Sequence, residues 1–218
     1  MTAILWDHDD TLMDTLPGRL KALASAYEQT VGGWVDPIEL WRSHRGGSLE
    51  ALGQRLLGSD GRRFVDTYRE IYYGGDRTFR PFEGIPALLQ SCHQAGIPMG
   101  VVTSKVSWGA TEELEAAALL HYFATVVGAD DTDTHKPDPA PIFVALERML
   151  VDDPARVVFI GDSPADVLAA RNAGCIAVAA TWGTLDRELL LDAGPRHVAP
   201  SPAHVLAILR EHFGEAAP

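Results

Sequence analysis

The chain has 218 residues, of which 46% are hydrophobic and 22% are charged, and its formal net charge at pH 7 is −12. This composition is typical of a globular protein, and the length allows one large domain or one domain with a sizeable insertion. The acidic excess argues against a nucleic-acid or anionic-membrane partner, because such partners require a basic face. An anionic substrate is still allowed, since a bound metal and one lysine can reverse the local charge.

Several features favour a cytoplasmic location. The two cysteines, Cys92 and Cys175, stand in apolar contexts, which are typical of buried free thiols in a reducing compartment. The first residues do not show the basic and apolar regions of a secretory signal. Apolar runs stay shorter than the roughly 18 residues that span a bilayer. We therefore expect a cytoplasmic enzyme or binding protein, acting as a monomer or homodimer.

The first predicted element is an apolar strand at residues 3–6, which ends abruptly in the acidic sequence DHDDT at residues 7–11. Closely spaced carboxylates raise one another's pKa, so such a cluster is favoured in water or around a cation. Hard oxygen ligands at a strand end suit Mg²⁺, which takes one or two carboxylates and completes its shell with phosphate and water. Taken alone, this stretch could equally form a solvated acidic turn.

A helical segment follows. Residues 16–27 carry apolar side chains at helical spacing, with a proline in the first turn. Further helices are predicted after the N-cap residue Asp36, from Ser48 onward, and over residues 62–73, where a glycine pair ends the helix. We therefore predict that residues 15–79 form an all-helical module inserted into the main body.

From residue 80 onward, predicted helices and strands alternate. The strands are predicted at residues 98–104, 125–129, 156–163 and 175–182, and the helices at 85–94, through 112–119, and at 142–150, 163–174, 185–191 and 202–213. Near-continuous apolar strands joined by helices indicate a parallel sheet with helices on both faces. The predicted fold is α/β, with a Rossmann-like core of residues 1–14 and 80–218 plus the helical insertion.

Polar reactive groups stand at the ends of the predicted strands or in the loops between them. In an open α/β sheet, sites form outside the carboxyl ends of the strands, and parallel strands direct those ends to the same edge. Each group alone has an ordinary explanation as a strand end, a solvated lysine or a helix-dipole partner. Together they supply the positioning, metal binding and charge stabilisation that phosphoryl transfer requires. The groups are Asp7, Asp9, Thr103, Ser104, Lys136, Asp162 and Asp166.

Four short motifs resemble those of the haloacid dehalogenase (HAD) superfamily of phosphohydrolases. In chain order they are DHDDTL at residues 7–12, VVTS at 101–104, KPDP at 136–139 and GDSPAD at 161–166. The helical module after the first motif resembles the small helical cap of that family. The sequences RPFEG at residues 80–84 and TWG at 181–183 look most like members of the phosphoglycolate-phosphatase type.

The resemblance implies roles for the two acids of the first motif. Asp7 would attack phosphorus and form an aspartyl-phosphate, and Asp9 would protonate the leaving oxygen and then activate water. Dehalogenase-type and phosphonatase-type relatives lack an Asp at the position of Asp9, so the resemblance favours hydrolysis of phosphate esters. Between these acids, we expect the side chain of His8 to point away from both, as alternate side chains do along an extended chain.

The other motifs would bind phosphate and metal. The resemblance implies that Thr103 and the backbone N–H of Ser104 bind the phosphoryl group, and that Lys136 neutralises the charge of nucleophile and phosphate. It also implies a Mg²⁺ site formed by Asp7, the backbone carbonyl of Asp9, Asp162 and, directly or through water, Asp166.

One position departs from the family pattern, and one segment is a candidate for substrate binding. Asp10 stands where the family usually has glycine; because Asp tolerates left-handed backbone conformations, we expect activity to be retained. In the helical module, Gly46 and its neighbouring glycine would let the backbone approach a ligand. Arg45 would hold a carboxylate or second phosphate in bidentate fashion. A simple linker with a solvated arginine is the alternative.

The sequence therefore predicts a Mg²⁺-dependent phosphatase acting on a small phosphorylated metabolite, with 2-phosphoglycolate as the leading candidate. A sugar phosphomutase with the same intermediate is a second possibility. A receiver-type phosphoryl-binding module is a third, which the helical insertion and the late Gly161-Asp162 pair disfavour. A catalytically silent scaffold is least favoured, because every expected acid, hydroxyl and cation is present.

Overall fold

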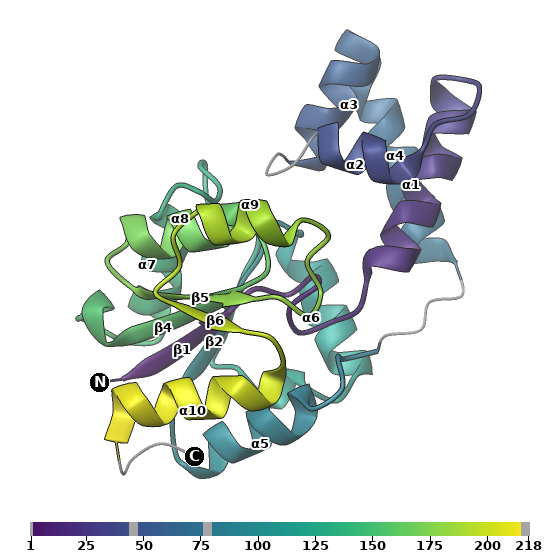
Figure 1. Ribbon diagram of the computed structural model, residues 1–218. Helices are drawn as coiled ribbons and strands as arrows, with labels where there is room; N and C mark the ends of the chain where they lie inside the picture. Colours follow the sequence, from purple (N-terminus) through teal and green to yellow (C-terminus); the bar gives the residue numbers. More distant parts are fainter. Residues whose placement is uncertain (1, 44–47, 76–79, 215–218) are drawn as a thin grey trace. The chain divides into compact units, whose positions relative to one another are not determined.

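The computed structural model describes residues 2–43, 48–75 and 80–214. The chain divides into two compact units (Figure 1). The α/β unit comprises Met1–Asp14 and Phe79–Pro218, and the helical unit comprises Thr15–Thr78. The site predicted from the strand ends therefore belongs to the α/β unit alone.

The α/β unit is built on one six-stranded sheet whose paired strands are all parallel, in the order β3-β2-β1-β4-β5-β6. The first strand of the chain, β1, is central: Ile4 is aligned with Met99 of β2 on one side and with Val158 of β4 on the other. The strands are β1 (Ala3–Trp6), β2 (Met99–Val102), β3 (Thr125–Val127), β4 (Val157–Gly161), β5 (Ile176–Ala180) and β6 (His197–Ala199). This is the parallel sheet predicted from the apolar runs.

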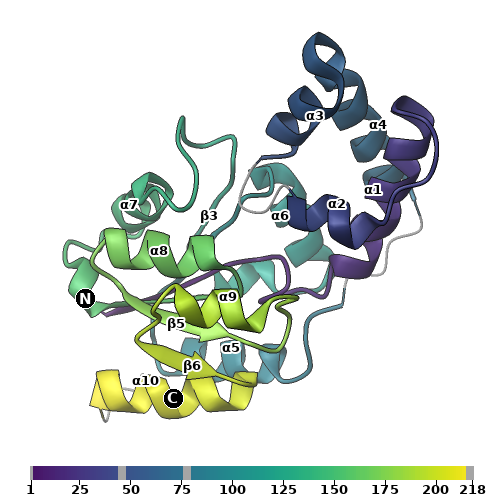
Figure 2. The ribbon, with the colours of Figure 1, turned by 45° about the horizontal axis from the view of Figure 1, so that its top comes forward.

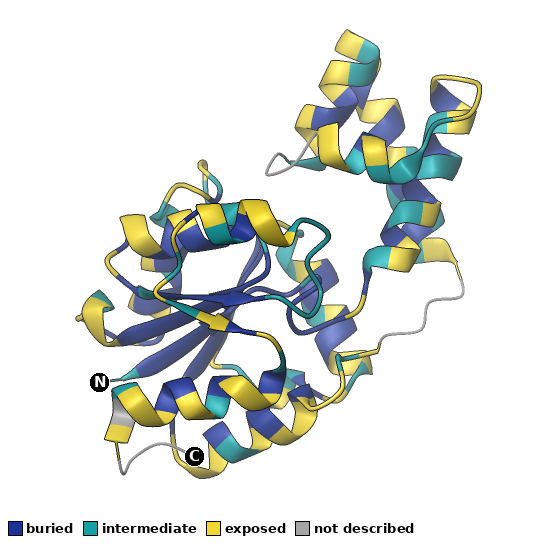
Figure 3. Cartoon of the chain, viewed as in Figure 1, coloured by how far each residue is buried: buried dark blue, intermediate teal, exposed yellow. Residues whose placement is uncertain are grey.

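Helices cover both faces of the sheet (Figures 1 and 2). Side chains of β1 alternate between two apolar cores: Ile4 and Trp6 enter one, Ala3 and Leu5 the other. The first core includes residues of α5 (Ile85–Gln94), α6 (Ser107–Ala116) and α10 (Pro202–Phe213). The second includes residues of α7 (Ala140–Arg148), α8 (Pro164–Asn172) and α9 (Arg187–Asp192). Burial on both faces explains why the central strands are nearly continuous apolar runs (Figure 3).

Short turns of 3₁₀ helix occur at η2 (Leu120–Tyr122) and η3 (Pro154–Arg156) in the connections of the α/β unit. The two cysteines are buried free thiols, as predicted. None of the helices in the part of the chain that the structure describes is long and apolar enough to cross a membrane.

The helical unit contains α1 (Leu16–Thr30), α2 (Pro37–Ser43), α3 (Leu49–Leu57), the 3₁₀ turn η1 (Gly58–Asp60) and α4 (Gly61–Gly74). Its described residues include no strand, and they pack around an apolar core of their own that includes Leu23, Leu52 and Phe64. The predicted N-cap residue Asp36 acts as expected, because its Oδ1 accepts a hydrogen bond from the backbone N–H of Ile38 at 2.9 Å. The hydroxyl of Ser48, where another helix was predicted to begin, accepts from the backbone N–H of Ala51 at 3.2 Å.

The prediction missed one strand and placed the end of one helix too far along the chain. Strand β6 was not predicted, because it has only three residues at the sheet edge and Val198 is exposed, so no continuous apolar run marks it. The helix predicted through residue 119 ends at Ala116, because the chain turns at Ala118 with a positive φ of 56°. Neither difference changes the strands that position the site.

Candidate active site

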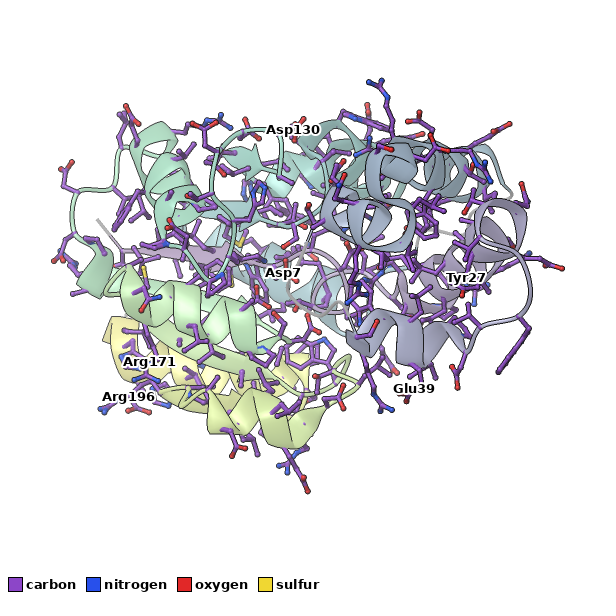
Figure 4. The ribbon with its side chains drawn as sticks, turned by 90° about the horizontal axis from the view of Figure 1, so that it is seen from above. Asp7, Tyr27, Glu39, Asp130, Arg171 and Arg196 are labelled. Atoms are coloured by element: carbon purple, nitrogen blue, oxygen red, sulfur yellow. The ribbon has the colours of Figure 1, made fainter. Side chains whose placement is uncertain are left out.

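Asp7 follows the central strand β1, at the carboxyl edge of the sheet. Its backbone N–H donates to the carbonyl of Ile160 in β4 at 2.8 Å, which extends the strand pairing to the nucleophile candidate. The side chain of Asp7 is buried, whereas Arg171 and Arg196, labelled in the same view, are exposed (Figure 4). The cation that pairs with Asp7 comes instead from a loop.

That cation is Lys136. Its Nζ donates to Oδ1 of Asp7 at 2.7 Å, to Oδ1 of Asp166 at 2.5 Å and to the carbonyl of Val102 at 3.1 Å. Three acceptors match the three protons of an ammonium group. Burial alone would lower the pKa of Lys136, but the carboxylates of Asp166 and Asp7 raise it above its ordinary value. Lys136 is therefore a fixed positive charge beside Asp7.

Asp166 is fixed by the start of α8. The backbone N–H and the hydroxyl of Ser163 both donate to Oδ2 of Asp166, at 3.0 and 2.6 Å. The backbone N–H of Asp166 donates in return to the Ser163 hydroxyl at 3.3 Å, which completes a capping box. Gly161 lies against the Asp166 side chain and leaves no room there for a Cβ. The local sequence of motif four thus determines where this carboxylate lies.

Asp162 completes the acidic cluster from the end of β4. Its Oδ1 accepts a hydrogen bond from the hydroxyl of Thr11 at 2.9 Å. Burial and the nearby carboxylates of Asp10, Asp7 and Asp166 raise the pKa of Asp162 well above its ordinary value. Burial and Asp166 likewise raise the pKa of Asp7 to about 7, although Lys136 acts in the opposite direction.

These residues fit a divalent cation. Carboxylate oxygens of Asp7, Asp162 and Asp166 lie within 4.8 Å of one another. Burial raises the pKa values of Asp7 and Asp162, and repulsion among the carboxylates, which one lysine cannot fully neutralise, raises them further. A hard cation with oxygen ligands would remove that repulsion, and the donor set is of the kind that Mg²⁺ prefers.

The turn after Asp7 is held by its own backbone hydrogen bonds and by Trp182, which follows β5. Asp10 has a left-handed φ of 62°, the kind of unusual backbone angle expected where the family has glycine. The backbone N–H groups of Leu12 and Met13 both donate to the carbonyl of His8, at 3.0 Å. The indole Nε1 of Trp182 donates to the carbonyl of Thr11 at 3.0 Å. The segment after β5 therefore supports the turn that carries Asp10 and Thr11.

Asp9 belongs to a second group of charged side chains. Its Oδ1 lies 2.9 Å from Nζ of Lys105 and 3.4 Å from Nδ1 of His8. The expectation that His8 points away from Asp9 was wrong: the imidazole is fully buried, and its Nε2 lies 3.5 Å from Oε2 of Glu113. The alternation of an extended chain does not hold here, because the backbone already begins to turn at His8.

Comparisons with known proteins identify the family. A model of the haloacid dehalogenase-like hydrolases matches residues 4–180. The chain belongs to this family. A Neisseria meningitidis phosphoglycolate phosphatase is 34% identical over 198 residues, covering 86% of this chain and 83% of the relative. The provisionally named pyrophosphatase PpaX of Caldanaerobacter subterraneus is 33% identical over 213 residues, which cover 96% of this chain and 95% of the relative.

The solved structures agree with the family and the fold. A haloacid dehalogenase-like hydrolase from Streptococcus pneumoniae superposes with a TM-score of 0.81 at 26% identity. The match covers 95% of this chain and 98% of that one. The family and the Rossmann-like parallel sheet predicted from the sequence are therefore confirmed.

In this haloacid dehalogenase-like hydrolase, motif two lies at the end of β2, the strand beside β1. Thr103 is buried, its backbone N–H donates to the carbonyl of Val127 at 2.9 Å, and its hydroxyl accepts from the backbone N–H of Lys105 at 3.1 Å. Ser104 is exposed. The predicted phosphate-binding roles of both residues stay predictions. The proposed substrate-binding residues Arg45 and Gly46 lie outside the described residues.

Two charged residues of this hydrolase were not found by sequence reasoning. Lys105 directly follows motif two, and Glu113 lies on the buried face of α6 next to Leu114. The available signal was an acidic residue at a helix position that should be apolar. A fully buried Glu requires a partner, and the lysine beside motif two is that partner at 2.6 Å.

Proposed function

We propose that this hydrolase is a Mg²⁺-dependent phosphatase that hydrolyses a small phosphomonoester through an aspartyl-phosphate on Asp7. The observation that carries the proposal is the pairing of buried Asp7 with Lys136 at 2.7 Å, within a cluster of three carboxylates at the sheet edge. A carboxylate nucleophile needs an adjacent cation, because its own negative charge otherwise repels the phosphate.

In the first step, a carboxylate oxygen of Asp7 attacks phosphorus while the bond from phosphorus to the ester oxygen breaks. Lys136 holds Oδ1 of Asp7, so we assign the attack to Oδ2. Asp9 donates its proton to the departing oxygen. In the second step, Asp9 takes a proton from water, whose oxygen attacks phosphorus. The bond between phosphorus and Asp7 breaks, which releases inorganic phosphate and restores both acids.

Asp7, Asp162 and Asp166 would hold the metal through their carboxylates, with the backbone carbonyl of Asp9 as a further ligand. Bound Mg²⁺ would neutralise the negative charge of the phosphoryl group. Thr103 and the backbone N–H of Ser104 would donate hydrogen bonds to that group. Lys136 would offset its charge from the side of the nucleophile.

For the substrate we propose 2-phosphoglycolate. The support is the 34% identity to a Neisseria meningitidis protein named phosphoglycolate phosphatase, together with the resemblance of residues 80–84 and 181–183 to that type. Arg45 and Gly46, in a helical cap, would recognise the substrate carboxylate. Pyrophosphate is a second candidate, because the relative named pyrophosphatase PpaX is 33% identical over nearly the whole chain.

The test measures phosphate release by the purified protein with Mg²⁺ and a panel of 2-phosphoglycolate, pyrophosphate, sugar phosphates and p-nitrophenyl phosphate. We expect the highest kcat/KM for 2-phosphoglycolate, and no turnover after chelation of the metal. Asp7→Asn should abolish turnover, whereas Asp192→Asn, on the exposed side of α9, should not. A wild-type protein that releases no phosphate from any of these compounds would contradict the proposal.

The same preparation separates the alternatives. Turnover in water enriched in oxygen-18 should place the label in the released phosphate if water attacks the intermediate. A sugar phosphomutase would instead return the phosphoryl group to the sugar without label. A receiver-type module would accumulate a stable phospho-Asp7 and release no product.

A further inference from the structure

Three buried or nearly buried polar side chains, those of Lys105, Glu113 and His8, form a network with Asp9. Lys105 is at its centre: Nζ donates to Oε1 and Oε2 of Glu113 at 2.7 and 2.6 Å, and lies 2.9 Å from Oδ1 of Asp9. The side chain of Glu113 is fully buried, and that of Lys105 is 6% exposed. His8 completes the network through its contacts with Asp9 and Glu113.

A contribution to folding stability does not by itself explain why Lys105 and Glu113 form a buried ion pair. Desolvation of two charges offsets much of their mutual attraction, and a well-packed apolar pair of similar volume is often as stable. What the pair does provide is a fixed ammonium group. Glu113 engages Lys105 through both carboxylate oxygens, so the lysine is anchored to α6 and its Nζ is held against Asp9.

The contacts also distinguish the two oxygens of Asp9. Both Lys105 and His8 approach Oδ1, at 2.9 and 3.4 Å. A carboxyl group anchored through one oxygen presents the other in a fixed direction, and proton transfer is effective only within hydrogen-bond reach of the reacting atom. Contacts from two side chains to Oδ1 therefore restrict the orientation of the Asp9 carboxyl group.

We propose that Lys105 is a positioning residue that holds Asp9 for proton transfer, and that Glu113 acts by anchoring Lys105. This inference rests on the proposed function, in which Asp9 is the general acid and base. The site then uses its two buried lysines differently. Lys136 serves the nucleophile Asp7, and Lys105 serves the acid Asp9.

The test compares two substrates that differ in their need for an acid. An alkyl phosphomonoester has a poor leaving group that must be protonated, whereas p-nitrophenolate leaves without a proton. The value of kcat/KM reports the steps through departure of the leaving group. The variant is Lys105→Met/Glu113→Gln, because Lys105→Met alone would leave the Glu113 carboxylate buried without its lysine.

We expect the double variant to lose about 100-fold in kcat/KM for the alkyl phosphomonoester that the wild type hydrolyses best, and less than about threefold for p-nitrophenyl phosphate. Lys105→Arg, which keeps a cation beside Glu113, should recover part of the loss. Glu115→Gln, an exposed position of the same helix, is the control for the change on α6.

Each outcome decides the question. Equal losses with the two substrates, or no loss with either, would show that Lys105 only packs the interior and would overturn the inference while leaving the phosphatase intact. A double variant that does not fold would show that the Lys105–Glu113 pair is needed for stability, and it would also overturn the inference. A wild-type protein without phosphatase activity would overturn the proposed function, and this inference with it.

Discussion

Gly183 lies directly against the backbone carbonyl of Asp10, with no room between them for a side chain. This contact joins the segment after β5 to the turn after β1. Its neighbour Trp182 reinforces the contact through the hydrogen bond to Thr11. Thr11 in turn donates to Asp162, so the position of a candidate metal ligand depends on a glycine 21 residues further along the chain.

Gly183→Ala should therefore impair the site. A Cβ at this position must displace the turn, and overpacking of this kind costs about 1–3 kcal/mol. We expect a lower free energy of unfolding in urea and at least a tenfold weaker activation by Mg²⁺ (about 1.4 kcal/mol). Gly74→Ala, where nothing lies within 4 Å of the added Cβ, is the stability control. A Gly183→Ala protein with the stability and Mg²⁺ activation of the wild type would contradict the close contact between Gly183 and Asp10.

Lys136→Met should remove activity almost completely. The substitution leaves the carboxylates of Asp7 and Asp166 buried without their shared cation, and the loss of one electrostatic partner in an active site lowers kcat on the order of 10²–10³. Lys136→Arg should not restore turnover, because a planar guanidinium cannot reach the same three acceptors. Substantial turnover by Lys136→Met, measured as phosphate release, would rule out the proposed role.

The pKa of Asp7 predicts how the metal-free protein responds to pH. This pKa is about 7 in the folded protein and near the ordinary value of 3.8 in the unfolded chain. Between these values the folded state binds the proton more tightly, so stability is greatest at the acidic end and is lost as pH rises towards 7. The pKa of Asp162 is also raised in the folded protein, so this carboxyl group likewise contributes less stability as the pH rises.

Melting temperatures between pH 5 and 8, with and without Mg²⁺, measure this effect. The stabilisation by Mg²⁺ should grow with pH, because the metal competes with protons for the same carboxylates. Asp7→Asn, compared with the wild type, should flatten the pH dependence of the metal-free protein. A Mg²⁺ shift that is the same at pH 5 and pH 8 would contradict the prediction.

Substitutions of Asp10 test its backbone conformation. At a φ of 62°, an alanine is strained by roughly 1–2 kcal/mol, and a glycine is not. We expect Asp10→Gly to be more stable than Asp10→Ala by about that amount in urea denaturation, and to retain phosphatase activity. Equal stabilities of the two variants would mean that the turn relaxes when the Asp10 side chain is removed.

The strand-end residues could be predicted because their positions follow from local pattern and parallel topology. Asp7 and Asp162 each come directly after an apolar run or its final glycine, and parallel pairing places those ends at one edge. The start of α8 was predictable for a similar reason, since Ser163 and Asp166 form a capping box within four residues. In such cases the sequence neighbours are also the structural partners.

The network around Asp9 could not be predicted in this way. Its members come from the segments after β1 and β2 and from α6, and the pairing of Lys105 with Glu113 depends on which face of α6 is buried. The contact of Gly183 with Asp10 is equally non-local. The direction of the His8 side chain was predicted wrongly, because the alternation of side chains along an extended strand does not hold where the backbone already turns. The positions that sequence reasoning missed are those set by tertiary packing.

The central place of β1 has a consequence for protein synthesis. The ribosome makes this strand well before its hydrogen-bonding neighbours, which begin only at Met99 and Val157, so β1 must wait for both. The helical unit is continuous in sequence and can fold during that interval. Asp7 and Lys136 therefore meet late in biogenesis, and a nascent chain released before β4 would carry Asp7 without Asp162 and Asp166.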